Sequence, residues 1–161
     1  MIIILMGVSG SGKTTIGRLL AQDLGWPFYD GDDFHPQANI DKMRQGMPLT
    51  DDDRAAWLTA LRHFIDTLAQ NHRSAVLACS ALKQMYRDRL RVGQPEVYFV
   101  YLKGDYNLIR QRLLARQGHF MPEKLLKSQF DTLEEPEDAP TIDIAQTPEN
   151  IIEQIRKAVG V

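Results

Sequence analysis

The sequence predicts a single α/β domain, residues 1–161, built around a parallel sheet. Three observations lead to this prediction. The chain of 161 residues has the length of one domain. Short apolar runs alternate along it with longer amphipathic stretches, as in strands joined by helices in βαβ units. A glycine-rich motif lies between the first apolar run and the first amphipathic stretch, where an α/β protein turns from strand to helix.

Five apolar runs are expected to form the strands of this sheet. Ile2–Met6, Ala75–Cys79 and Val97–Leu102 are rich in β-branched or aromatic residues and predict strands buried on both faces. Pro27–Asp30 and Thr141–Ile144 are weaker candidates for two more strands.

Two helices are well marked between and after these runs. Apolar residues recur with a 3.6-residue period from Trp57 to Leu68, after a Thr50–Asp53 segment that suits a helix start. The same period runs from Ile151 to Val159, with Thr147 as the candidate N-cap and a proline in the first turn.

The composition narrows the possible classes of protein. Hydrophobic residues make up 43% and charged residues 25% of the chain, as in ordinary globular domains. With 19 Lys and Arg against 21 Asp and Glu, the formal net charge is −2, which indicates neither a nucleic-acid partner nor attraction to an anionic membrane. No stretch approaches the roughly 20 apolar residues that span a bilayer.

The N-terminal run and the cysteine content bear on location. Ile2–Met6 has no basic region before it and is too short for the core of a signal peptide. Cys79 is the single cysteine, so no internal disulfide can form, and this favours a reducing compartment. We therefore expect a cytoplasmic protein.

The strongest motif is Gly7–Thr14, which fits the pattern G-x-x-x-x-G-K-[ST] in full. Its glycines let backbone N–H groups converge on phosphate oxygens close to a helix N-terminus. Lys13 can then neutralise the β and γ phosphates, and the Thr14 hydroxyl can complete a Mg²⁺ shell. The motif therefore predicts a site for a nucleoside triphosphate with magnesium, made by Gly7, Val8, Ser9, Gly10, Ser11, Gly12, Lys13 and Thr14.

Missing motifs restrict what is done with the triphosphate. The chain has no N-K-x-D segment and no D-x-x-G segment, so a switch GTPase is disfavoured. The third predicted strand continues into Ser80–Lys83 without the acidic residue typical of ATPase motors. A small-molecule phosphotransferase needs neither feature.

Carboxylates follow the second predicted strand. Alternation along an extended segment sends Asp30 and Asp32 to the same side, at the sheet edge where open α/β sheets bind ligands. One carboxylate can hold magnesium through water, while the other orients and deprotonates an acceptor hydroxyl.

Basic residues gather in the second half of the chain. Residues 83–116 carry a net charge of +5 and the remainder −7. Arg112 and Arg116 are four residues apart and share a helix face, before Gln117–His119, which we expect to be flexible. Arginines at the base of a mobile flap would close over the triphosphate, stabilise the transferring charge and exclude water.

At this point the residues resemble a known family. Gly7–Thr14 with Phe28–Asp32 is similar to the shikimate kinase-like group of small P-loop kinases. Longer segments resemble the gluconate kinases in particular, and together they cover nearly the whole chain. These segments are Asp30–Pro36 with Asn39, Lys42–Met43 and Gly46; Pro48–Leu49 with Asp51, Asp53–Arg54 and Trp57–Leu58; Cys79–Lys83 with Tyr86–Arg87 and Leu90–Arg91; and Gly118–Phe120 with Leu125–Leu126, Ser128–Phe130 and Leu133–Glu134.

The resemblance implies an activity and a fold. The activity is ATP-dependent phosphorylation of D-gluconate at its 6-hydroxyl, giving 6-phospho-D-gluconate and ADP. The fold is a three-layer α/β/α arrangement with a five-stranded parallel sheet in the order 2-3-1-4-5. A lid at about residues 112–125 and a homodimer are also implied.

The resemblance also implies roles for single residues. ATP would be held by Gly7–Thr14 with Arg112 and Arg116, and Mg²⁺ by Thr14 and Asp30. The catalytic residues would be Lys13, Asp32, Arg112 and Arg116. Gluconate would be bound from among Asp32, His35, Arg54, Ser80, Lys83 and Arg87. For its carboxylate, Arg54 and Lys83 rank first, because Arg binds a carboxylate bidentately and Lys supplies a mobile point charge.

Two alternatives stay open on sequence grounds. One is a kinase for another small polyol or acid, such as shikimate. The other is a nucleotide-binding sensor without catalysis, whose mark would be loss of Lys13 or of the Asp30 and Asp32 pair. Both features are intact.

Overall fold

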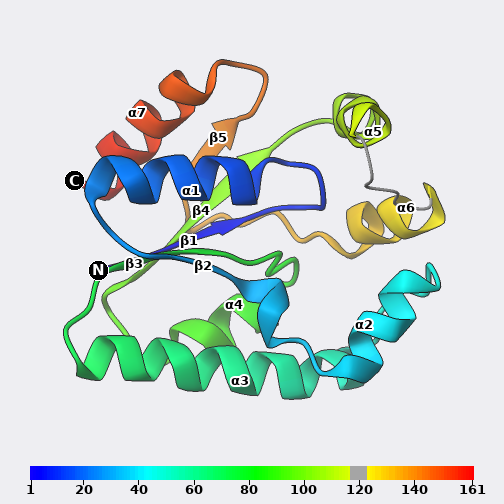
Figure 1. The fold of residues 1–161 in the computed structure, drawn as a ribbon, viewed down its shortest axis with the longest axis horizontal. Coiled ribbons are helices and arrows are strands. Elements are labelled where there is room, and N and C mark those ends of the chain that lie inside the picture. Colours follow the sequence, from blue (N-terminus) through cyan, green and yellow to red (C-terminus); the bar gives the residue numbers. More distant parts are fainter. Residues whose placement is uncertain (117–122) are drawn as a thin grey trace.

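A five-stranded sheet lies between two layers of helices in the computed structural model, which describes residues 1–116 and 123–161 (Figure 1). The strands are β1 (Ile2–Met6), β2 (Phe28–Asp30), β3 (Ala75–Ala78), β4 (Val97–Lys103) and β5 (Thr141–Asp143). The α-helices are α1 (Lys13–Leu24), α2 (Gln37–Arg44), α3 (Asp51–Gln70), α4 (Gln84–Arg91), α5 (Tyr106–Ala115), α6 (Glu123–Thr132) and α7 (Pro148–Val159). A short 3-10 helix, η1 (Gly31–Phe34), follows β2.

The strands lie in the order β2-β3-β1-β4-β5, and each neighbouring pair is parallel. This confirms the predicted fold class and strand order. All five predicted strands are present, with ends that differ from the prediction by one residue at most. Cys79, for example, lies just beyond β3, although its N–H still donates to Leu5 O at 3.0 Å.

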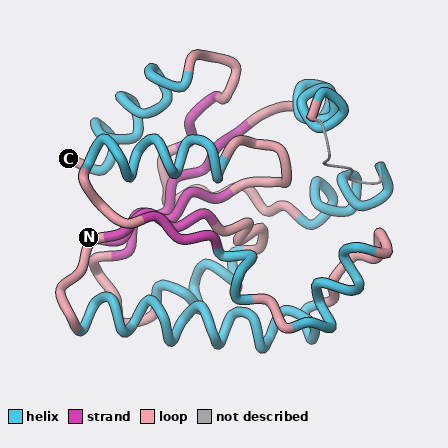
Figure 2. The backbone as a smooth tube through the Cα atoms, in the orientation of Figure 1, coloured by secondary structure: helices cyan, strands magenta, loops and turns pink. Residues whose placement is uncertain are grey.

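Two hydrophobic cores cover the two faces of the sheet, which Figure 2 shows enclosed by helices. Ile3 and Leu5 pack with α1, α5 and α7 in one core, and Ile2 and Ile4 pack with α3 and α4 in the other. Successive side chains of a strand point to opposite faces, so a strand covered on both faces must be apolar throughout. Every residue of β1 is accordingly 0% exposed.

The two predicted helix starts are confirmed by their caps. At α3, Asp53 N–H donates to Thr50 Oγ1 at 3.1 Å, and Thr50 N–H donates back to Asp53 Oδ2 at 2.9 Å. At α7, Asn150 N–H donates to Thr147 Oγ1 at 3.3 Å. Such caps stabilise a helix by about 1 kcal/mol each.

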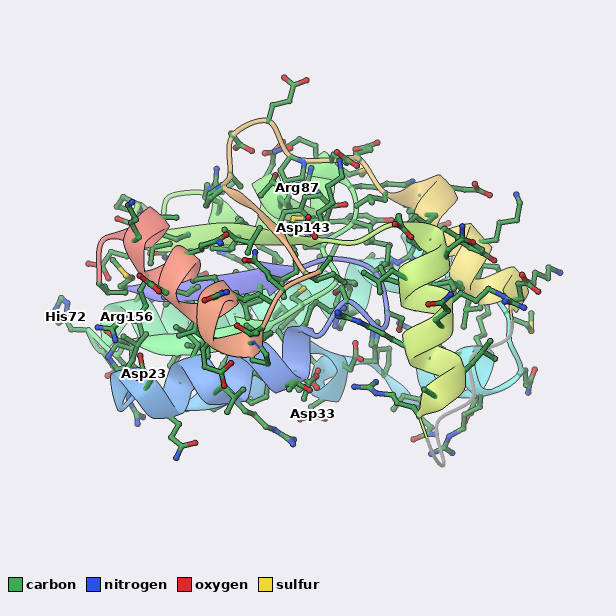
Figure 3. The ribbon with its side chains drawn as sticks, turned by 90° about the horizontal axis from the view of Figure 1, so that it is seen from above. Asp23, Asp33, His72, Arg87, Asp143 and Arg156 are labelled. Atoms are coloured by element: carbon green, nitrogen blue, oxygen red, sulfur yellow. The ribbon has the colours of Figure 1, made fainter. Side chains whose placement is uncertain are left out.

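The two ends of the molecule differ. The loop between β1 and α1 lies at the same end of the molecule as α2, α5 and α6 (Figure 1). At the opposite end, Arg156 of α7 and Asp23 of α1 lie side by side (Figure 3), with Nη1 and Oδ2 2.6 Å apart. Of the helices in the described ranges, none is both long and apolar enough to cross a membrane.

Candidate active site

The glycine-rich loop Gly7–Thr14 joins β1 to α1. Gly7 has φ +151°, and a Cβ there would lie 2.8 Å from Ser11 Oγ and 2.9 Å from Leu102 O, so no side chain fits. Gly12 caps α1 with φ +96°, a left-handed conformation that glycine adopts without steric cost. The loop therefore curls tightly at the N-terminus of α1, where backbone amides and the helix dipole favour an anion.

Lys13 stands at this loop without a carboxylate partner. Its Nζ donates to Gly7 O at 3.0 Å and to Val8 O at 2.9 Å. Burial lowers the pKa of Lys13, and the nearby Asp32 charge opposes that change most strongly. Within the described ranges the lysine forms no ion pair. Its charge is therefore available to a phosphate.

Asp30 lies where β2 ends and is bound on both oxygens. Its Oδ1 accepts from Asp32 N–H at 2.9 Å, which starts η1, and its Oδ2 accepts from Thr14 Oγ1 at 3.3 Å. Hydroxyl and carboxylate oxygens are the hard donors that Mg²⁺ prefers, and Mg²⁺ commonly uses one or two protein groups beside substrate phosphates. Thr14 and Asp30 thus fit a magnesium ion.

Asp32 lies in η1 and lines a cavity together with Lys13. The Asp32 side chain is 74% exposed, but it faces a cavity walled by protein. Partial desolvation of the carboxylate there raises the pKa of Asp32. The Asp30 charge acts in the same direction, whereas Lys13 opposes it. A carboxylate in this setting has a greater affinity for a proton than an ordinary aspartate has.

A cavity of about 310 Å³ brings part of the predicted site together. Its lining includes six of the residues expected from the sequence: Ser9, Lys13, Asp32, His35, Arg54 and Ser80. Arg54 donates through Nη1 to Leu49 O at 2.8 Å and to Tyr86 Oη at 3.2 Å. A guanidinium has five N–H donors, so others remain for a ligand.

The structure does not bring Lys83 or Arg87 into this cavity. Lys83 Nζ pairs with Asp51 Oδ1 at 2.9 Å instead. Arg87 is 2% exposed, and its guanidinium donates to Ala81 O at 2.8 Å and Glu134 O at 2.8 Å. Figure 3 labels Arg87 over α4. Because its donors hold backbone carbonyls, Arg87 ties the loop after β3 to the segment after α6.

Two cavity residues were missed by the sequence reasoning. Arg44 closes α2 and lines the cavity, and nothing in the sequence distinguishes it from a solvated helix end. Gln129 of α6 accepts from Ser9 N–H through Oε1 at 2.6 Å, so it contacts the glycine-rich loop directly. Gln129 entered the sequence comparison only through the resemblance, which gave it no role.

Arg112 and Arg116 line a second cavity, of about 250 Å³, next to Gly10 and Gly12 of the glycine-rich loop. Arg112 Nη2 donates to Ile144 O at 2.9 Å, which fixes the end of α5 against the loop after β5. The glycine-rich loop thus contributes to two cavities, one lined by Asp32 and one lined by these arginines. Residues 117–122 of the predicted lid lie outside the described residues.

Comparisons with known proteins identify the family of this chain. The family model for shikimate kinase matches residues 9–159. The thermosensitive gluconokinase of Escherichia coli (strain K12) is 51% identical over 160 residues, covering 97% of this chain and 86% of the relative.

Solved structures give the same result. A sugar kinase from Janibacter sp. HTCC2649 superposes with a TM-score of 0.92 at 44% identity, covering 99% of this chain and 94% of the other. A gluconokinase from Sinorhizobium meliloti 1021 superposes with a TM-score of 0.88 at 42% identity, covering 98% and 90%. The chain therefore belongs to the shikimate kinase family of P-loop kinases and, within that family, to the gluconokinases.

Proposed function

We propose that this protein transfers the γ-phosphate of ATP to the 6-hydroxyl of D-gluconate, giving 6-phospho-D-gluconate and ADP. The observation that carries the proposal is a single cavity lined by both Lys13, at the phosphate-binding loop, and Asp32, a carboxylate open to a substrate. The gluconokinase relatives support the choice of substrate.

ATP would lie across the glycine-rich loop. The second cavity, with Arg112 and Arg116, suits the adenosine end, and the loop amides suit the phosphates. Lys13 would leave the Gly7 and Val8 carbonyls for the β and γ phosphates and stabilise the charge that develops there. Thr14 and Asp30 would hold Mg²⁺, which supplies further positive charge to the phosphates when it is bound.

Gluconate would occupy the 310 Å³ cavity. Both Arg44 and Arg54 line its wall, and a guanidinium binds carboxylate oxygens bidentately. Arg54 suits the substrate carboxylate better, because Leu49 O and Tyr86 Oη hold its guanidinium in place. Asp32 would face the 6-hydroxyl at the other end of the substrate. In the transfer step the O6–Pγ bond forms, the bond from Pγ to the bridging oxygen breaks, and ADP leaves with that electron pair. The O6 proton passes to the Asp32 carboxylate.

A coupled assay tests this proposal. The protein with ATP, Mg²⁺ and D-gluconate should form a product that 6-phosphogluconate dehydrogenase oxidises. Shikimate in parallel should give little turnover, and faster turnover of shikimate would overturn the choice of substrate. ATP binding without a phosphorylated product from any sugar acid would instead favour a nucleotide-binding sensor.

Three further features belong to the same proposal. A lid at about 112–125 follows from the resemblance, and α6, which begins at Glu123, contacts the phosphate loop through Gln129. A homodimer and a cytoplasmic location follow from the resemblance and from the single cysteine, respectively. Sedimentation of the purified protein tests the dimer, and fractionation of cells that express it tests the location.

A further inference from the structure

The imidazole of His35 is held rigidly beside Asp32. Its ring stacks on the Trp57 ring, with centroids 4.4 Å apart and an interplanar angle of 11°. Trp57 is 0% exposed, and its Nε1–H donates to Gly31 O at 2.7 Å. The Trp57 ring is therefore fixed by packing and by a buried hydrogen bond, and it presents a flat, immobile face to His35.

Asn39 of α2 determines which imidazole nitrogen carries the proton. Asn39 is 3% exposed, and its Nδ2 lies 2.7 Å from Asp53 O and 3.2 Å from His35 Nδ1. A backbone carbonyl only accepts hydrogen bonds, so the Asn39 atom facing it must be the amide nitrogen. The second hydrogen of that nitrogen points to His35 Nδ1, which must then accept. A neutral imidazole that accepts at Nδ1 carries its proton on Nε2.

The environment keeps this imidazole neutral near pH 7. Burial, together with the Arg54 charge, lowers the pKa of His35 to about 4. The side chain of His35 is only 4% exposed. His35 is thus a donor through Nε2–H and has no other proton to give.

One hydroxyl group can bridge His35 and Asp32. His35 Nε2 lies 3.9 Å from Asp32 Oδ1, which is beyond the roughly 2.7–3.2 Å of a direct N–H···O hydrogen bond. Both residues line the cavity. An oxygen atom placed beside both groups can reach each of them at hydrogen-bond distance.

We propose that His35 donates its Nε2–H to the acceptor hydroxyl of the substrate while that hydroxyl donates to Asp32, and that Asn39 is the positioning residue that fixes the His35 tautomer. This inference rests on the proposed kinase function. A hydroxyl has one proton and two lone pairs. When its proton is donated to Asp32 and one lone pair accepts from His35, the hydroxyl has one lone pair left to attack the γ-phosphorus.

His35 is neither acid nor base in this arrangement. Its Nε2–H bond stays intact while the O–Pγ bond forms, the bond from Pγ to the bridging oxygen breaks and the hydroxyl proton moves to Asp32. The hydrogen bond holds the hydroxyl oxygen in position for attack, and it strengthens while the proton leaves that oxygen for Asp32.

Two substitutions separate hydrogen bonding from packing. His35→Phe keeps a ring to stack on Trp57 but has no donor, whereas His35→Gln has an amide donor and no ring. We expect His35→Phe to lower kcat roughly 10- to 100-fold, with the KM for ATP unchanged, and His35→Gln to recover a large part of the loss. His63→Gln, at an exposed position of α3, is the control and should match the wild-type protein.

The kinetic outcomes decide the role of the donor. Equal losses in the Phe and Gln variants, or wild-type kcat in the Phe variant, would overturn it. If the wild-type protein phosphorylates no gluconate at all, the proposed function fails. The tautomer of His35 can then still be tested without substrate.

Nitrogen-15 NMR of histidine-labelled protein provides that test. The His35 signals, assigned by their loss in His35→Phe, should show a neutral ring protonated at Nε2 around pH 7. Asn39→Ala should shift the ring toward a mixture of tautomers and lower kcat, with a smaller change in the KM for ATP. A proton on Nδ1 in the wild-type protein would overturn the inference. Should Asn39→Ala fail to fold, the wild-type spectrum and the Phe and Gln pair still decide.

Discussion

Two clusters near the carboxyl end of the sheet each contain lysine and aspartate, in different arrangements. The cleft cluster consists of Lys13, Asp30 and Asp32, and the α3–α4 cluster consists of Asp51, Lys83 and Tyr86 with the neighbouring Arg54. In the α3–α4 cluster, Asp51 accepts from both Lys83 Nζ and Tyr86 Oη, so its charges are satisfied internally. In the cleft cluster, Lys13 donates to backbone carbonyls and pairs with neither aspartate.

The two arrangements shift the pKa of their aspartates in opposite directions. Hydrogen bonds from Tyr86 and Lys83 lower the pKa of Asp51. The surroundings of Asp32 raise its pKa. Charges that a protein leaves without a partner are available to a ligand, and perturbed titration at a cleft marks a functional site more often than paired surface charge does. We infer that the cleft cluster performs the chemistry and the α3–α4 cluster positions Arg54.

Substitution of Asp32 and of Asp51 should give the largest difference in kcat between the two clusters. Asp32→Asn should lower kcat by roughly 10²–10⁴-fold, because a general base is removed, with a smaller change in ATP affinity. Asp51→Asn should leave kcat close to the wild-type value. Both are measured in the coupled gluconate assay, with circular dichroism to verify folding. Near-normal turnover by Asp32→Asn would show that transfer needs little help from this carboxylate.

The two lysines provide the next comparison. Lys13→Met should lower kcat by about 10²–10³-fold, the usual loss for a group that stabilises transition-state charge. Lys83→Met removes a partly exposed ion pair and should cost at most about 1 kcal/mol of unfolding free energy. Kinetics and urea unfolding of both variants test this pair. A loss of kcat in Lys83→Met as large as that in Lys13→Met would mean that the α3–α4 cluster reaches the reaction after all.

Arg87 carries a buried charge, and we expect it to stabilise the fold rather than bind substrate. Arg87→Met keeps much of the side-chain volume but leaves backbone carbonyls without donors, so we expect unfolding free energy to fall by about 3–4 kcal/mol. Arg89→Met, at an exposed position of the same helix, is the control. Urea unfolding measures the loss, and the KM for gluconate of the folded variant should not change. If the KM for gluconate rose while the free energy of unfolding stayed normal, Arg87 would be a substrate-binding residue.

These clusters also show what the sequence predicts and what it does not. The strand order, the phosphate loop and the Asp30 and Asp32 pair were predicted, because each follows from local pattern, motif or resemblance. The partners of Lys83 and Arg87 were not, since an ion pair with Asp51 or bonds to the carbonyls of Ala81 and Glu134 depend on tertiary packing. Gln129 was missed for the same reason, as its partner Ser9 is 120 residues away.

The last prediction concerns the effect of pH on His35. Its pKa of about 4 in the folded protein lies below the ordinary value of 6.5, so between these values the unfolded chain binds more protons. The stability contribution is complete above pH 6.5 and is lost as the pH falls toward 4. At pH 4.5 the wild-type protein should have lost about 2–3 kcal/mol from this residue alone.

His35→Phe isolates this contribution, because every other titrating group is common to both proteins. Urea unfolding at pH 7 and pH 4.5 should therefore show a smaller acid-induced loss in the variant, and the difference between the two losses measures His35. Parallel pH dependences would mean that the folded protein accepts a proton on His35 readily. The imidazole would then carry a charge beside Arg54, and the neutral donor inferred for the cleft would not exist at acidic pH.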